Sequence, residues 1–167
     1  MISGGSLRFS TAWSIPEGVV SADSICYSFG VGENIGFEEA LHAASGCRWE
    51  LFDPTPVAVA YIAAVPRDWY RFHAVGIGTA DGPLQFFWWP RKRRGRDRCG
   101  WTAHPPYAGF EPAGILECRT LATIMRALEH PRIDMVKLDV EWIEEAVLPQ
   151  ALALDPLPKV VMVDHDT

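Results

Sequence analysis

Short apolar runs and helix-spaced apolar residues alternate along most of the chain. The run Ser24–Val31 (SICYSFGV) is apolar and aromatic and ends near glycines, a pattern typical of a buried strand. Phe37–Ser45 follows with apolar residues spaced as on one side of a helix, and Gly46 is placed to end that helix. Arg48–Phe52 repeats the strand pattern, and Thr55–Val65 repeats the helical one. The first half is thus predicted to fold as strand, helix, strand, helix.

The second half continues this alternation after one irregular stretch. Phe72–Ile77 and Leu84–Trp89 have strand patterns, and the turn residues between them predict a hairpin. Pro90–Glu111 shows no periodicity and contains several glycines and prolines, which predicts a long surface loop. Thr120 is a candidate N-cap for the helix after it. The last predicted elements are a helix, a strand, a helix and a strand, at Leu121–Glu129, Asp134–Val140, Glu144–Ala153 and Lys159–Val163.

This order of elements predicts an α/β fold with three layers. Strands that alternate with helices favour a mostly parallel, Rossmann-like sheet with helices on both faces. A length of 167 residues fits one domain. We expect residues 1–22 to form an N-terminal lead segment and residues 23–167 to form the domain, with one inserted hairpin strand. No helix follows the last strand, so we expect a shortened C-terminal part and a homodimer that covers this strand.

Composition narrows the class of protein. With 49% hydrophobic and 22% charged residues, the chain has the make-up of a soluble globular protein. Its longest uncharged apolar run, Val57–Pro66, is half of what a membrane span needs, and no signal peptide is evident, so no membrane association is expected. The four cysteines form no CxxC pair, which argues against a metal site and favours reduced thiols and a cytoplasmic location.

Charge is distributed unevenly along the chain. The net charge is -6, yet residues 91–98 hold six cations and one acid, so this segment carries +5 and the remainder -11. A nucleic-acid-binding protein normally has a broad basic surface, and nucleic acid is therefore not an expected partner. The segment is either a solvated loop or a site for an anion. Under the second interpretation, Arg93 and Arg94 are candidate contacts to an acidic small-molecule acceptor.

The candidate cofactor site lies just after the first two strands, because such sheets bind ligands at the carboxyl ends of their strands. Gly30 and Gly32 allow a tight turn against a ligand, and Asp53 ends the second strand, 21 residues after Gly32. An acid there can accept both ribose hydroxyls of an adenosine. S-adenosylmethionine and a nicotinamide dinucleotide both remain open. Glu33 favours the former, since a carboxylate would repel a pyrophosphate and attract an ammonium or sulfonium group.

The strand Asp134–Val140 adds charged residues in strict alternation. Lys137, Asp139 and Glu141 share one side of the strand if it extends that far. Charges in a buried strand are paired or lie at a site. Lys137 is either paired with a carboxylate or part of a site, and we take Asp139 and Glu141 as candidates for a catalytic base and for positioning an acceptor. His165, just after the last strand, is a further candidate base.

These motifs, in order, resemble the FkbM-like family of S-adenosylmethionine-dependent methyltransferases. The resemblance runs from about Ser24 to Leu148 through YSFGVGENIGFEEAL, LFDPTP, FHAVGIGTADGPLQFF, CRTLATIM and IDMVKLDVEWIEEAVL. The last segment is similar to the family pattern K-I-D-x-E-G-A-E, with Lys137, Asp139, Glu141 and Glu144 at the matching positions. The resemblance implies a class I methyltransferase fold, with Gly30, Gly32 and Asp53 at the cofactor-binding positions.

Two departures from the family pattern bear on the expected activity. Trp142 and Ile143 replace the glycine and alanine of the motif, so the Trp142 indole either fills the space of a substrate or offers it a stacking surface. The family sheet has seven strands, and this chain supplies five clear ones and the hairpin strand. We expect O-methylation of a small molecule or sugar. A catalytically degenerate domain that acts in binding or oligomer assembly is the alternative, and a nicotinamide-dependent oxidoreductase is the third.

Overall fold

A five-stranded parallel sheet forms the centre of the protein. The computed structural model describes residues 6–9, 13–93, 96–104 and 109–164, with the backbone alone for residues 6–9, 89–93 and 96–99. The sheet order is β11 (Val160–Val163), β10 (Met135–Leu138), β3 (Ile25–Phe29), β4 (Arg48–Phe52) and β5 (Tyr70–His73), and every neighbouring pair is parallel. The first parallel strand along the chain, β3, therefore lies in the middle of the sheet. β4 and β5 follow on one side of it, and β10 and β11 are added later on the other side. This reversal of strand order creates a switch point between β3 and β10.

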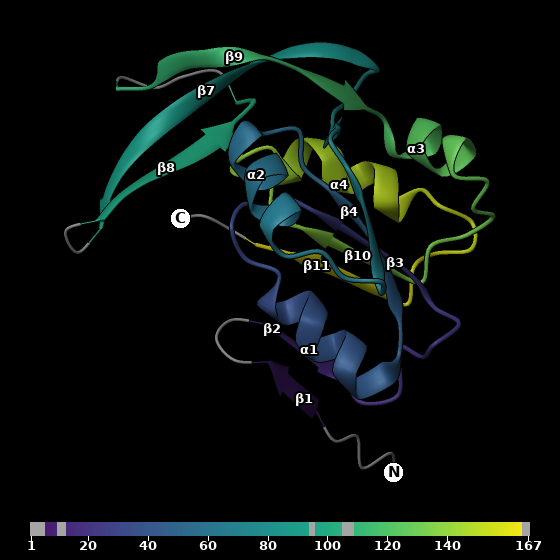
Figure 1. Cartoon of the computed structure of the whole chain (residues 1–167). Coiled ribbons are helices and arrows are strands. Elements are labelled where there is room, and N and C mark those ends of the chain that lie inside the picture. The colour runs from purple at the N-terminus through teal and green to yellow at the C-terminus, as the bar shows by residue number, and fades with distance from the viewer. Residues whose placement is uncertain (1–5, 10–12, 94–95, 105–108, 165–167) are drawn as a thin grey trace.

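Two pairs of helices cover the two faces of this sheet (Figure 1). On one face, α1 (Gly36–Ser45) and α2 (Pro56–Ala64) pack on sheet residues that include Cys26 and Leu51. On the other face, α3 (Leu121–Ala127) and α4 (Glu144–Leu152) pack on residues that include Phe29 and Leu138. The Thr120 side chain accepts a hydrogen bond from the amide of Thr123 and caps α3, as predicted. The expected three-layer α/β architecture is confirmed.

A second, largely antiparallel sheet arches over one end of the first (Figure 1). Its order is β6 (Gly76–Ile77), β9 (Glu111–Arg119), β7 (Gly82–Arg93) and β8 (Arg96–Thr102). It is formed entirely by residues between β5 and α3, so it is an insertion between the third and fourth parallel strands in chain order. We call it the inserted sheet.

Two predictions for this region are wrong. Pro90–Glu111 is not a long loop, because β7 extends to Arg93 and β8 returns in register, pairing Arg91 with Arg98 and Arg93 with Arg96. A two-stranded ribbon that is polar on both faces has no hydrophobic alternation by which to recognise it. The predicted hairpin also does not form. β5 joins the parallel sheet, the short β6 pairs with β9, and the partners of β7 are β8 and β9.

The N-terminal segment contributes to the core. β1 (Ser6–Phe9) and β2 (Trp13–Pro16) form a hairpin, and Ile15 and Val20 are buried in the same cluster as α1. The Trp13 ring lies 6.1 Å from the ring of Phe37. Among the helices described here, none is both long enough and apolar enough to span a membrane. Three of the four cysteines are described side chains, Cys26, Cys47 and Cys118, and all three are buried free thiols as predicted.

Candidate functional site

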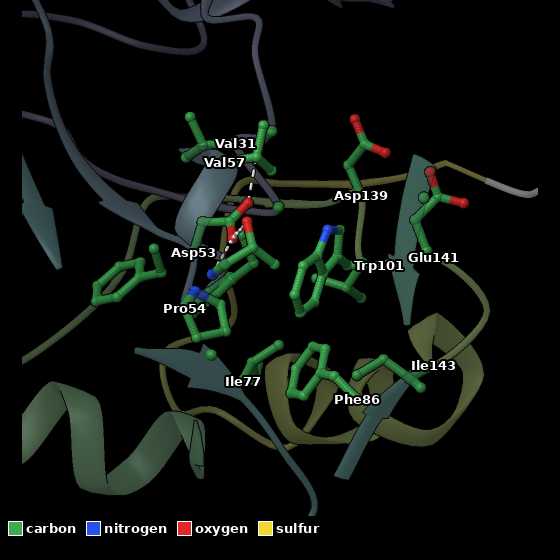
Figure 2. A pocket seen from close by; sticks show the side chains of 18 of the residues that line it. Val31, Asp53, Pro54, Val57, Ile77, Phe86, Trp101, Asp139, Glu141 and Ile143 are labelled. Atoms are coloured by element: carbon green, nitrogen blue, oxygen red, sulfur yellow. Dashed lines mark hydrogen bonds between the residues drawn. The ribbon is translucent and has the colours of Figure 1, made fainter. Parts of the chain in front are cut away.

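A cavity of ≈ 290 Å³ opens at the switch point of the parallel sheet (Figure 2). Its floor is formed by the residues that follow β3, β4 and β10, among them Gly30, Asp53 and Asp139. The inserted sheet closes the opposite side with Phe86 and Trp101. The volume is close to the lower end of the roughly 300–1,000 Å³ range of small-molecule pockets. Both sheets are therefore needed to make this cavity.

The turn after β3 requires its first glycine for two reasons. Gly30 has φ = 84°, in the left-handed region, and a Cβ added there would lie 1.7 Å from the backbone oxygen of Asp139. The ends of β3 and β10 thus approach more closely than any side chain would allow. Gly32 has φ = 52° with open space around it, and its amide donates a 2.9 Å hydrogen bond to Oδ2 of Asp53. The glycine turn is in this way held against the end of β4.

Asp53 is buried and already bonded on both carboxylate oxygens. Its Oδ1 accepts hydrogen bonds from the amide (2.8 Å) and the hydroxyl (2.6 Å) of Thr55, and Oδ2 accepts the amide of Gly32. Thr55 in turn caps the N-terminus of α2. A carboxylate has about four acceptor positions, so Oδ2 keeps one for a further donor. Asp53 thus organises the glycine turn and the start of α2 and still lines the cavity.

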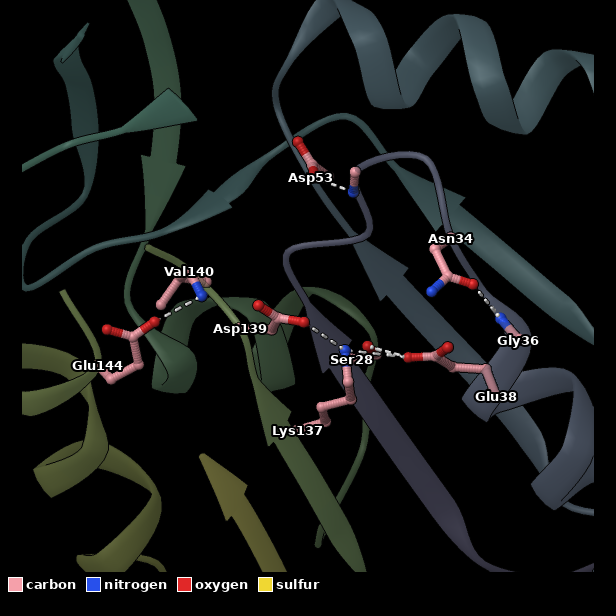
Figure 3. A network of polar contacts seen from close by, with 10 residues as sticks. Ser28, Asn34, Gly36, Glu38, Asp53, Lys137, Asp139, Val140 and Glu144 are labelled. Atoms are coloured by element: carbon pink, nitrogen blue, oxygen red, sulfur yellow. Dashed lines mark hydrogen bonds and ion pairs between the residues drawn. The ribbon is translucent and has the colours of Figure 1, made fainter. Parts of the chain in front are cut away.

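Lys137 is the centre of a buried charged network beneath the cavity (Figure 3). Its Nζ lies 3.2 Å from Oδ2 of Asp139 and 3.5 Å from Oε1 of Glu38, which also accepts a 2.7 Å hydrogen bond from the hydroxyl of Ser28. Burial alone would lower the pKa of Lys137, but the carboxylates of Glu38 and Asp139 hold that pKa above its ordinary value. The pairing of Lys137 with a carboxylate is confirmed. This ion pair holds Asp139 in place just after the end of β10.

The segment between β10 and α4 presents Glu141 to the cavity in an unusual backbone conformation. Glu141 has φ = 51° and Trp142 has φ = 75°, two consecutive non-glycine residues in the left-handed region. Such residues cost about 1–3 kcal/mol each and persist only where the surroundings hold them. Glu144, at the start of α4, accepts a 2.9 Å hydrogen bond from the amide of Val140 and so holds one side of this segment.

The family pattern has glycine at the position of Trp142, and the backbone explains this. A φ of 75° is a conformation that glycine adopts freely and tryptophan rarely does. The indole is not among the side chains that line the cavity. It packs instead against the rings of His104 and Phe110, with centroids 6.2 and 5.5 Å away. Ile143, the second departure, does line the cavity.

Of the predicted site residues, five line the cavity: Gly30, Gly32, Asp53, Asp139 and Glu141. Glu33 does not line the cavity, whereas the neighbouring Asn34 does. The side chain of Arg93, together with Arg94 and His165, falls outside what the structure describes.

Several cavity residues missed by sequence reasoning come from the inserted sheet. Phe86 was placed on a strand but not at the site, and Gly100 and Trp101 fell in the segment predicted as a loop. Figure 2 shows the Trp101 indole between Asp53 and the acidic residues Asp139 and Glu141. Trp101 is far from Asp139 and Glu141 in the sequence. Its place at the site could therefore be recognised only from the folded structure, which brings these segments together.

No family model, no curated protein and no solved structure matches this chain. What can be said of its function therefore rests on the fold and on the chemistry of the cavity.

Proposed function

We propose that the protein is a class I methyltransferase that uses S-adenosylmethionine and methylates an oxygen of a small molecule or sugar. The observation that carries the proposal is the lining of the cavity. A glycine turn tied to an acid at the end of the next strand lies at the switch point, and Asp53, Asp139 and Glu141 surround the space. The motif resemblance to the FkbM-like family points to the same chemistry.

The charge of the lining favours this cofactor over a dinucleotide. Three carboxylates line the cavity, and no described residue that lines it is lysine, arginine or histidine. A pyrophosphate needs cationic or amide donors, and the carboxylates that line the cavity would repel it. S-adenosylmethionine carries an ammonium and a sulfonium group, which carboxylates attract. In this proposal, Asp139 and Glu141 supply the attraction to these groups that was expected of Glu33 from the sequence.

Each part of the cavity has a distinct task in this proposal. Asp53 would accept a ribose hydroxyl at Oδ2, and the turn Gly30–Gly32 would let the backbone approach the cofactor. When bound, the cofactor supplies an electrophilic methyl group on sulfur. Asp139 or Glu141 would take the proton of the acceptor hydroxyl while the acceptor oxygen bonds to the methyl carbon. The bond between sulfur and the methyl carbon would break, and the sulfur would keep its electron pair. Such a base contributes roughly 10²–10⁴-fold, and alignment of the two reactants contributes most of the remainder.

Calorimetric titration tests the cofactor directly. We expect S-adenosylmethionine and S-adenosylhomocysteine to bind the purified protein, and the oxidised and reduced nicotinamide dinucleotides to give no heat. Mass spectrometry of ligand that copurifies with the protein provides a second, independent identification. Absence of heat with both sulfur ligands at millimolar concentration would overturn the proposal. Binding of these ligands without methyl transfer to any acceptor in a cell extract would favour the degenerate binding domain instead.

The acceptor is proposed to be acidic, on the evidence of residues 91–98. The β7–β8 register sets Arg91 opposite Arg98 and Arg93 opposite Arg96, and like charges directly opposite each other destabilise a strand pair. Lys92 faces Asp97 in the same register, so the ribbon holds two like-charge pairs against one opposite-charge pair, and an anion such as a phosphorylated or carboxylated sugar would relieve the remaining repulsion. Replacement of Arg93, Arg94 and Arg96 by serine should leave cofactor binding unchanged and lower the turnover of an acidic acceptor, together with its salt dependence. Equal turnover and salt response in this variant would show that the segment is only a solvated surface.

A further inference from the structure

The inserted sheet holds the segment that carries Glu141. Thr102, at the end of β8, is buried, and its hydroxyl donates a hydrogen bond to the backbone carbonyl of Glu141. The same hydroxyl oxygen accepts a 3.0 Å hydrogen bond from the amide of His104. The Thr102 hydroxyl is thus used twice, once within the inserted sheet and once across to the segment after β10.

Two further contacts join the same two segments. A Cβ added at Gly100 would lie 3.6 Å from both the carboxyl carbon and Oε1 of Glu141, an ordinary van der Waals distance, so β8 lies next to this acid. The Trp142 ring lies against His104 and Phe110, which belong to the described parts of the connection from β8 to β9. Three independent contacts therefore converge on two consecutive residues.

These two residues also have left-handed backbone, which among the described non-glycine residues they share only with Glu129 near the end of α3. A conformation of this kind persists only where its surroundings over-determine it, and such conformations concentrate at functional sites. α4 supplies one restraint through Glu144, whose carboxylate binds the amide of Val140. The inserted sheet supplies the others at Glu141 and Trp142. The backbone of Glu141 and the ring of Trp142 are thus both contacted from outside the Rossmann-like core.

We propose that Thr102 is a positioning residue for Glu141, and that docking of the inserted sheet and the conformation of residues 140–143 are coupled. In this view the inserted sheet is more than a wall of the cavity, because its β8 strand holds the acid in the conformation that the ligand meets. The role of Glu141 toward the ligand rests on the proposed function, whereas the coupling itself does not.

Two substitutions at Thr102 separate the hydroxyl from the shape of the side chain. Thr102→Val keeps the β-branched shape and loses both hydrogen bonds, and Thr102→Ser keeps the hydroxyl. Thr123→Val is the matched control. Thr123 lies in the first turn of α3, away from the cavity, and its hydroxyl donates a 2.7 Å hydrogen bond to the carboxylate of Asp81. Circular dichroism and thermal melting of all three show whether each variant is folded.

The coupling is measured by amide hydrogen exchange of residues 140–143. We expect about tenfold faster exchange there in Thr102→Val and wild-type exchange in Thr102→Ser and Thr123→Val. Unchanged exchange in a folded Thr102→Val protein would overturn the inference, and this readout needs no cofactor. Titration with S-adenosylhomocysteine then tests the link to the site, with about tenfold weaker binding expected for Thr102→Val alone. Lack of binding by the wild-type protein would overturn the proposed function while leaving the exchange result to decide the coupling.

Discussion

Two glycines of one turn make different demands at the residue scale. At Gly30 a Cβ would lie 1.7 Å from a backbone oxygen, whereas at Gly32 nothing lies within 4 Å of the added atom. Gly30→Ala must therefore separate β3 from β10, and we expect it to cost more than about 3 kcal/mol or to prevent folding. Gly32→Ala meets only the cost of its left-handed backbone, about 1–2 kcal/mol. Urea unfolding of the two variants provides the comparison, and equal losses would contradict the close approach of the strands.

The left-handed backbone at Trp142 leads to a prediction with an unusual sign. Trp142→Ala and Trp142→Gly both lose the ring contacts with His104 and Phe110, but only alanine keeps the strain. We expect the alanine variant to be the less stable of the two by about 1 kcal/mol, although alanine is normally the more stabilising residue by a similar amount. Thermal or urea unfolding measures the difference. A more stable alanine variant would show that residue 142 leaves the left-handed region once the indole is removed.

At the scale of elements, buried Asp134 ties together the starting ends of three strands. Asp134 directly precedes β10. Its Oδ2 accepts a hydrogen bond from the amide of Ile25, the first residue of β3, and its Oδ1 lies 3.0 Å from Nζ of Lys159, which directly precedes β11. Burial alone would raise the pKa of Asp134, but the hydrogen bond from Ile25 and the charges of Lys159 and Arg132 lower it below the ordinary 3.8. The stability that this carboxylate contributes is thus fully present above pH 3.8 and is lost as the pH falls through the lowered pKa.

The variant Asp134→Asn makes this contribution visible. At pH 7 we expect it to be less stable than the wild-type protein by roughly 1–3 kcal/mol, because the amide satisfies fewer of the donors around it. The difference between the two proteins should shrink as the pH falls below 3.8, since the wild-type carboxyl then becomes neutral too. Urea unfolding at several pH values from 7 to 2.5 measures it. A difference that stays constant across this range would contradict the lowered pKa.

The strands of the parallel sheet could be predicted from the sequence, and those of the inserted sheet largely could not. β3 and β10 are buried on both faces and the edge strand β11 is partly buried, and continuous apolar runs mark all three. β8 and the outer part of β7 carry arginines and lysine in a two-stranded ribbon, where neither face imposes an apolar pattern. β9 is largely exposed along its length, so it too lacks a clear alternation. Local pattern follows burial, and little of this sheet is buried.

The same reasoning separates the two halves of the cavity. Gly30, Asp53 and Asp139 could be predicted because the ends of parallel strands meet at one edge of the sheet, whatever the loops do. Phe86 and Trp101 arrive through docking of the inserted sheet, a long-range arrangement that no short stretch of sequence encodes. Motif spacing likewise gives the position of Trp142 but not the sign of its φ.

On the scale of the whole molecule, the cavity is the place where the two sheets meet. Residues of the parallel sheet and residues of the inserted sheet line the same ≈ 290 Å³ space. A ligand that fills it contacts both sheets at once and binds only the folded protein. Its binding free energy should therefore appear as stability of both sheets, not of one alone.

S-adenosylhomocysteine at 100 times its dissociation constant should stabilise the protein by about 2.7 kcal/mol, which for a chain of this size is a rise in Tm of roughly 5–11 °C. Amide exchange should slow at Gly30–Asn34 beside the parallel sheet and at Gly100–Thr102 on β8, and stay unchanged in the β1–β2 hairpin, which does not line the cavity. A nicotinamide dinucleotide at the same concentration is the control ligand and should shift neither quantity. Slower exchange at Gly30–Asn34 with no change at Gly100–Thr102 would mean that this ligand does not reach the inserted sheet, and would contradict a binding site shared by the two sheets.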